Sequence, residues 1–251
     1  MVILKFLPTF QNKDEYYERL MAGGRTGNNI LVLYAAVMAC AFIYGVVMGA
    51  YHSPVQAIVA GVKVAALLTI ALAICFPAFY IIQYILGSRL ALQQMLVIIF
   101  SGFLLMMVIM VSLIPVVVFF LLTGSNYYFL QLLHIAIFAF AGFFGMKTVI
   151  DALKYSCEKK NIYPQIGVTV FKFWVVILAF VSIQLAWNLR PFLGDRGEGF
   201  KLFRRYKGNF YTALIYSFRQ LAGPDRPEPK PNFSREPVPM LKDKGKCPDG
   251  K

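Results

Sequence analysis

The stretch LQQMLVIIFSGFLLMMVIMVSLIPVVVFFLL, residues 92–122, decides the fold of this chain. It contains no charged side chain, and it is longer than the roughly 20 residues that an apolar helix needs to cross a membrane. A helix of this length must tilt or begin in the interfacial layer. Pro115 removes a main-chain hydrogen bond near its far end, so we expect the helix to bend there.

Four further apolar stretches have the length and composition of membrane spans. Pro77 should kink the second span, and the spacing of Gly45 and Gly49 in the first favours close packing of helices rather than a dimer motif. The sequence therefore predicts an all-α fold, a polytopic transmembrane helix bundle of about five spans within residues 30–189. The predicted spans are residues 30–50, 63–86, 92–122, 129–146 and 167–189.

Polar segments flank the predicted bundle on both sides. Residues 1–29 form an N-terminal arm, in which the spacing of Tyr, Leu and charged residues over 10–21 predicts a short interfacial helix. Residues 190–222 are basic and aromatic, which predicts a segment that lies on the membrane or on a partner. Residues 223–251 are rich in proline and charge, a composition that cannot build its own core, so we expect an extended C-terminal tail.

The net charge of +13 is concentrated outside the apolar spans. Between Ile30 and Met146 the only charged residues are Lys63 and Arg89, and there is no acidic residue. Basic segments beside apolar spans set membrane topology or contact anionic lipid. The charge therefore indicates membrane lipids rather than nucleic acid as partners.

The distribution of Lys and Arg also predicts the orientation of the chain. The N-terminal arm, Arg89 and the predicted loop at 147–160 carry positive charge and should be cytoplasmic, whereas the loops at 51–62 and 123–128 have no Lys or Arg. With five spans, this orientation places the C-terminal tail in the periplasm. The tail itself argues for the opposite side, because 14 of the 25 Lys and Arg residues follow residue 189.

Few side chains in the spans could carry chemistry. His134 could bind a metal or haem or relay a proton, but no second His, Cys or carboxylate lies near it in the sequence, and a hydrogen-bonded core residue is the alternative. The four cysteines lie in different segments without paired spacing. Ion-coupled carriers and membrane metallohydrolases need carboxylates that these spans lack. We therefore predict a protein that is not an enzyme and holds no cofactor.

The densest polar cluster lies where the fifth span ends. Gln184, Trp187 and Asn188 share one helical face there, and Arg190 follows them. One interpretation is an interfacial anchor, with the indole at headgroup depth. The other is a docking face for a lipid headgroup or a partner subunit. The predicted partner- or lipid-binding residues are Lys63, Gln184, Trp187, Asn188, Arg190, Arg204 and Arg205.

Several motifs resemble an uncharacterised family of bacterial polytopic membrane proteins that is loosely similar to Yip-type membrane domains. The motifs are FPAFYIIQYILGSRL (76–90), SLIPVVVFF (112–120), QLAWNLRPFLG (184–194) and GNFY (208–211). The resemblance covers roughly residues 63–211 and implies a five-span helical architecture in a bacterial inner membrane. It implies no reaction, and the candidate positions that it adds are Lys63, Pro77, Arg89, Pro115, Trp187 and Arg190.

Two functions are compatible with these observations. The first is a non-catalytic integral membrane subunit or scaffold, whose tail contacts other protein subunits of a larger complex. The alternative is a lipid-handling or small-solute transport protein that uses the bends at Pro77 and Pro115 and the cations Lys63 and Arg190. Partner chains on the tail would favour the first function, and a continuous polar or lipid-filled cavity would favour the second.

Overall fold

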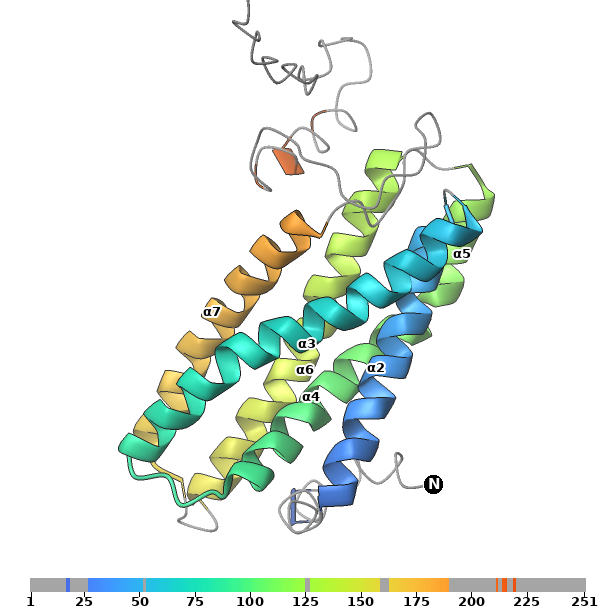
Figure 1. Ribbon diagram of the computed structural model, residues 1–251. Coiled ribbons are helices and arrows are strands. Elements are labelled where there is room, and N and C mark those ends of the chain that lie inside the picture. Colours follow the sequence, from blue (N-terminus) through green and yellow to red (C-terminus); the bar gives the residue numbers. More distant parts are fainter. Residues whose placement is uncertain are drawn as a thin grey trace, which may run out of the picture.

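The computed structural model describes residues 17–18, 27–51, 53–124, 127–158 and 163–189, and the single positions 211, 214, 215 and 219. These residues form helices and no strand (Figure 1). Five apolar segments are long enough to cross a membrane, which confirms the predicted all-α, five-span fold. The helices that build them are α2 (Gly27–Gly49), α3 (Pro54–Ile85), α4 (Leu92–Ser112), α5 (Ile114–Leu122), α6 (Tyr127–Glu158) and α7 (Gln165–Asn188).

The five spans pack as a ring of neighbours. Helix α2 contacts α3 and α4, α4 contacts α6, and α7 contacts both α3 and α6. The short helix α5 continues the third span and touches α2 and α6. Because the spans run in alternating directions, the start of α2 and the end of α7 lie at opposite ends of the bundle (Figure 1).

Helix α3, which forms the second span, begins about two and a half turns before residue 63, the start predicted from the sequence. Helix α3 starts at Pro54, and the hydroxyl of Ser53 caps it by accepting a hydrogen bond from the main-chain N–H of Gln56 at 3.2 Å. Lys63 therefore lies in the third turn of α3 and does not interrupt the apolar run. The prediction of a span that starts near residue 63 was wrong, because the buried side of the helix accommodates the lysine.

The two prolines in the spans differ in their effect. Helix α4 ends at Ser112 and α5 begins at Ile114, which agrees with the bend predicted at Pro115. Helix α3 is continuous through Pro77, so this residue does not end the helix.

Helix α6 extends past the predicted fourth span. Residues 147–158 are helical, so the prediction of a basic loop at 147–160 was wrong for this part. The extension has charges of alternating sign at helical spacing, which form one solvated stripe. The residues of the stripe are Lys147, Asp151, Lys154 and Glu158. Val149 and Leu153 on the other face are fully buried.

Close helix crossings hold the interior together. A Cβ added to Gly45 would lie 2.7 Å from the Cα of Gly61, so α2 and α3 touch through their main chains. A Cβ on Gly145 would lie 2.6 Å from the main-chain oxygen of Gly102, which gives the same type of contact between α4 and α6. Gly49 crowds α3 in the same way as Gly45, so this pair of glycines packs within the bundle.

Large apolar side chains cover much of the outer surface of the spans. On α7, for example, Phe173, Val176, Ile177 and Phe180 are all exposed, while Phe171 and Trp174 on the opposite side are buried. A soluble protein would not expose such a stripe, whereas lipid solvates it. The surface therefore agrees with a multi-pass membrane protein.

The flanking segments predicted from the sequence are only partly described. Tyr17 and Glu18 of the N-terminal arm are helical, and the ring of Tyr17 lies 5.3 Å from that of Tyr155 at the end of α6. The tail at 223–251 and nearly all of 190–222 lie outside the described residues.

Candidate functional site

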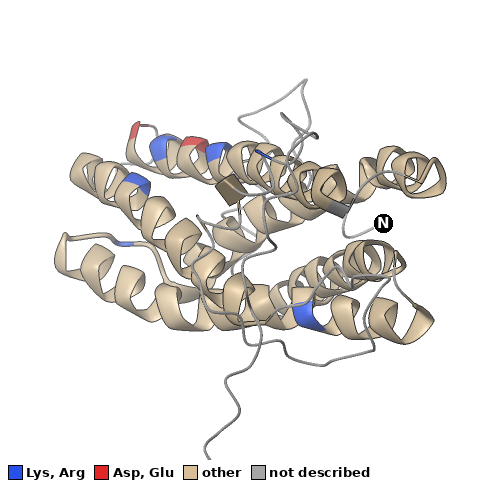
Figure 2. Ribbon diagram, turned by 90° about the horizontal axis from the view of Figure 1, so that it is seen from above, with Lys and Arg blue, Asp and Glu red and all other residues tan. Residues whose placement is uncertain are grey.

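The two ends of the bundle differ in their polar side chains. At the charged end, where α3 and α6 finish and α7 begins, exposed cations lie beside two acidic residues of α6 (Figure 2). The cations are Arg89, Lys147, Lys154 and Lys172. At the polar end, where α2 and α7 finish and α3 and α6 begin, the polar groups of the spans are mostly buried. These groups are Tyr44, Gln56, Lys63, His134, Gln184, Trp187 and Asn188.

Tyr44 and His134 form a buried pair at the polar end. The Tyr44 hydroxyl lies 2.7 Å from Nδ1 of His134, and the two side chains are 0% and 2% exposed. The tyrosine ring makes T-shaped contacts with the His134 and Phe138 rings, at centroid distances of 5.6 and 5.7 Å. The pair joins α2 to α6, so His134 is a hydrogen-bonded core residue, which was one of the two interpretations of its sequence.

The hydrogen bond limits what His134 can do. Its Nδ1 is engaged with Tyr44, so only Nε2 remains for a ligand. Within the described ranges, no group of three or more His, Cys, Asp and Glu side chains could hold a metal ion. The geometry at His134 is therefore that of a structural link between two helices.

Gln56 and Lys63 lie on one face of the first turns of α3. They are seven residues apart, which places them on the same side of the helix, and they are only 2% and 6% exposed. Val55, Ile58 and Val62 on another side of these turns are exposed on the outer surface of the bundle. Lys63 lies nine residues into the helix, about 13 Å from its start. A cationic side chain at this depth is a functional candidate because its burial is costly.

The exit of α7 supplies the other polar residues predicted from the sequence. Gln184 and Trp187 are half-buried and Asn188 is exposed in the last turn and a half of the helix. They lie at the same end of the bundle as Lys63, as expected. Arg190, Arg204 and Arg205 lie outside the described residues.

Helices α3 and α7 are joined through residues that the sequence analysis did not single out. The indole N–H of Trp174 donates to the main-chain oxygen of Cys75 at 3.0 Å. The rings of Phe79, Phe171 and Trp174 lie 4.8 to 5.2 Å apart. About two turns of helix closer to the charged end, Gln83 donates to the main-chain oxygen of Gly167 at 3.1 Å. None of these contacts involves Lys63.

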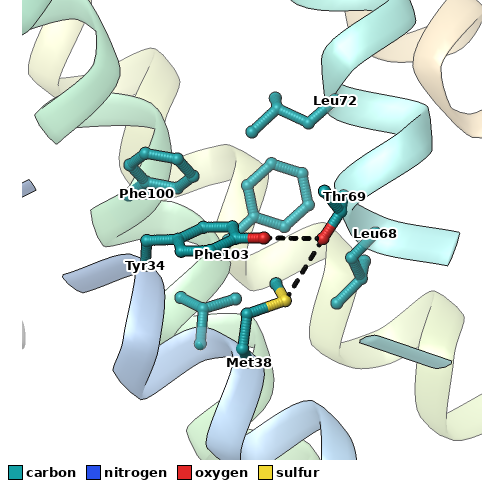
Figure 3. Close-up of a pocket in the computed structure, with 8 residues that line it drawn as sticks. Tyr34, Met38, Leu68, Thr69, Leu72, Phe100 and Phe103 are labelled. Carbon is teal, nitrogen blue, oxygen red and sulfur yellow. Dashed lines mark hydrogen bonds between the residues drawn. The ribbon is translucent and has the colours of Figure 1, made fainter. Parts of the chain in front are cut away.

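The contact of α2, α3 and α4 contains a small cavity. The Tyr34 hydroxyl lies 3.0 Å from Oγ1 of Thr69, which in turn lies 3.3 Å from the sulfur of Met38 (Figure 3). The rest of the lining is apolar and consists of Val37, Leu68, Leu72, Phe100 and Phe103. Its volume of about 10 Å³ is close to that of one water molecule, so the cavity is too small for a solute or a lipid chain.

Comparisons with known proteins give no relative from which a role could be taken. No protein-family model, curated protein or solved structure matches the chain.

Proposed function

We propose that this protein is a non-catalytic integral membrane subunit, whose helix bundle anchors or stabilises a larger membrane complex. The observation that carries the proposal is that hydrogen-bonded polar side chains in the bundle link its helices in pairs. Separate hydrogen bonds fasten α2 to α6, α2 to α3 and α7 to α3. Side chains that fasten helices in pairs are not arranged around a shared reacting centre, and they support a structural role.

The packing of the bundle supports the same role. The main-chain contacts at Gly45 and Gly145 leave little freedom for the helices to slide. A rigid bundle with apolar outer faces suits a subunit that holds other chains in place in a membrane. In this proposal, the segments at 190–222 and 223–251 supply the contacts to those chains, with Arg190, Arg204 and Arg205 as candidate residues.

We place the protein in a bacterial inner membrane, as the family resemblance implies. The exposed cations of the charged end fit the cytoplasmic side under the positive-inside rule. The start of α2 then faces the cytoplasm, and the chain leaves α7 on the periplasmic side.

The test is a comparison of the full chain with a variant that lacks residues 223–251, which leaves every described residue in place. Both chains are tagged and purified from their own membranes in a gentle detergent. We expect a defined partner at constant stoichiometry with the full chain only, while both chains unfold at the same temperature. Recovery of the full chain alone, as a monomer whose tail is open to proteases, contradicts the proposal.

A second function, in lipid handling or small-solute transport, is favoured by one observation. The cationic Lys63 is buried on the same face of α3 as Gln56, within the candidate membrane span, and an anionic lipid headgroup is the type of ligand that such a side chain attracts. Mass spectrometry of lipids that co-purify with the protein tests it. Loss of an anionic lipid in Lys63→Met, but not in the exposed control Lys172→Met, would support this function; equal lipid content would exclude it.

A further inference from the structure

Two buried polar atoms at the junction of α3 and α7 have no hydrogen-bond partner among the residues that the structure describes. They are the hydroxyl oxygen of Tyr163 and the side-chain oxygen of Gln83. Tyr163 is 3% exposed and Gln83 is fully buried. Folded proteins rarely leave such groups unsatisfied, because each has lost its hydrogen bonds to water. Two of them at one junction therefore require a partner.

Both side chains crowd the same glycine. A Cβ on Gly167 would lie 2.5 Å from the side-chain oxygen of Gln83 and 3.0 Å from Cζ of Tyr163, the carbon that carries the hydroxyl. The amide of Gln83 is held in one orientation, because its Nε2 donates to the main-chain oxygen of Gly167. The side-chain oxygen of Gln83 therefore stays next to Gly167, where the Tyr163 ring also lies.

The two atoms are chemically complementary. The side-chain oxygen of Gln83 can only accept a hydrogen bond. Burial, and to a lesser degree the nearby thiol of Cys157, raises the pKa of the Tyr163 hydroxyl, so this group stays protonated and can donate. A donor and an acceptor that both lie against Gly167 can be satisfied together by one small molecule between them.

We propose that a buried water molecule joins the hydroxyl of Tyr163 to the side-chain oxygen of Gln83 at the junction of α3 and α7. It accepts a hydrogen bond from Tyr163 and donates one to Gln83, and two polar partners are enough to hold a buried water. It thereby ties Tyr163, two residues before the start of α7, to the last turn of α3. This site is independent of the proposed function, since it concerns only how the two helices are joined.

The first test is the thermal unfolding of Tyr163→Phe in the full chain, purified in detergent. If the water is present, the variant leaves it with one partner, and we expect a lower unfolding temperature. If the hydroxyl is merely unsatisfied, its removal raises the unfolding temperature, which would overturn the proposal. Tyr84→Phe removes the same group from an exposed position and should change nothing.

The second test detects the water itself in the wild-type chain. Radiolytic hydroxyl-radical labelling modifies buried side chains that lie beside a bound water. We expect Tyr163 to be labelled several-fold more than Tyr44, which is equally buried but has its hydroxyl bonded directly to His134. Equal labelling of the two tyrosines means that Tyr163 has no water beside it, and this result overturns the proposal even if Tyr163→Phe is destabilised by loss of a direct bond.

Discussion

The crossing of α2 and α3 allows a prediction of stability with a matched control. An alanine Cβ at Gly45 would lie 2.7 Å from the Cα of Gly61 and 2.8 Å from the main-chain oxygen of Ala60. Carbon atoms normally rest about 3.5–4.0 Å apart, so the two helices must separate by about 1 Å. Neither neighbour is a flexible side chain that could move aside. Overpacking of this kind costs about 1–3 kcal/mol.

Gly142→Ala is the matched control. It also lies inside a helix, but its added Cβ would meet only the end of the Met106 side chain, at 4.0 Å. Both substitutions gain the same higher helix propensity of alanine, so the difference between them isolates the cost of the crossing. We expect Gly45→Ala to be less stable than Gly142→Ala by about 1–3 kcal/mol.

The assay is reversible unfolding of the full chain in mixed micelles with a rising fraction of SDS, followed by tryptophan fluorescence. The wild type and both variants are measured at the same protein concentration, so that any self-association is held constant. If the two variants have equal free energies of unfolding, α2 and α3 do not touch at Gly45. The described packing of the bundle would then be refuted.

Three further predictions concern the links between helices and the topology. Trp174→Phe keeps the ring contacts but removes the indole N–H bond to α3, and should lower the free energy of unfolding by about 1 kcal/mol in the same assay. Tyr44→Phe leaves Nδ1 of His134 buried without its partner and should cost about 1–3 kcal/mol; an unchanged stability would show that the pair does not exist. Single cysteines at Ser88 and Thr123, in a chain without its four native cysteines, should react with an impermeant maleimide from opposite sides of the membrane. Labelling from the same side would rule out a full crossing by α4 and α5.

The five spans were predictable because each rests on a local property of the sequence. An apolar run such as 92–122 must be a helix in a membrane, where no water is available to satisfy its main-chain groups. The break between α4 and α5 at Pro115 was predictable too, because the proline itself removes a hydrogen bond of the helix.

The errors at the span boundaries have a common cause. A charge in lipid is costly, so the sequence predicts that spans end at Lys63, Lys147 and Lys154. Lys63 lies instead on a buried side of α3, and the other two lie on an extension of α6 whose charges alternate in sign. Charge alone does not reveal whether a residue ends a helix or only a membrane crossing.

The links between helices could not be predicted, because they join distant parts of the chain. Tyr44 and His134 are 90 positions apart, and Trp174 lies 99 positions from Cys75. No local pattern indicates such a pairing. It arises from the way the spans pack, with α7 against α3, and α2 and α6 both against α4.

The most direct test of the proposed role is native mass spectrometry of the full chain, released from its own membrane without prior delipidation. We predict a species that contains this chain and at least one other polypeptide in fixed ratio, and that disappears when residues 223–251 are removed. A single chain that carries only lipid, in both the full and the shortened form, would contradict the account.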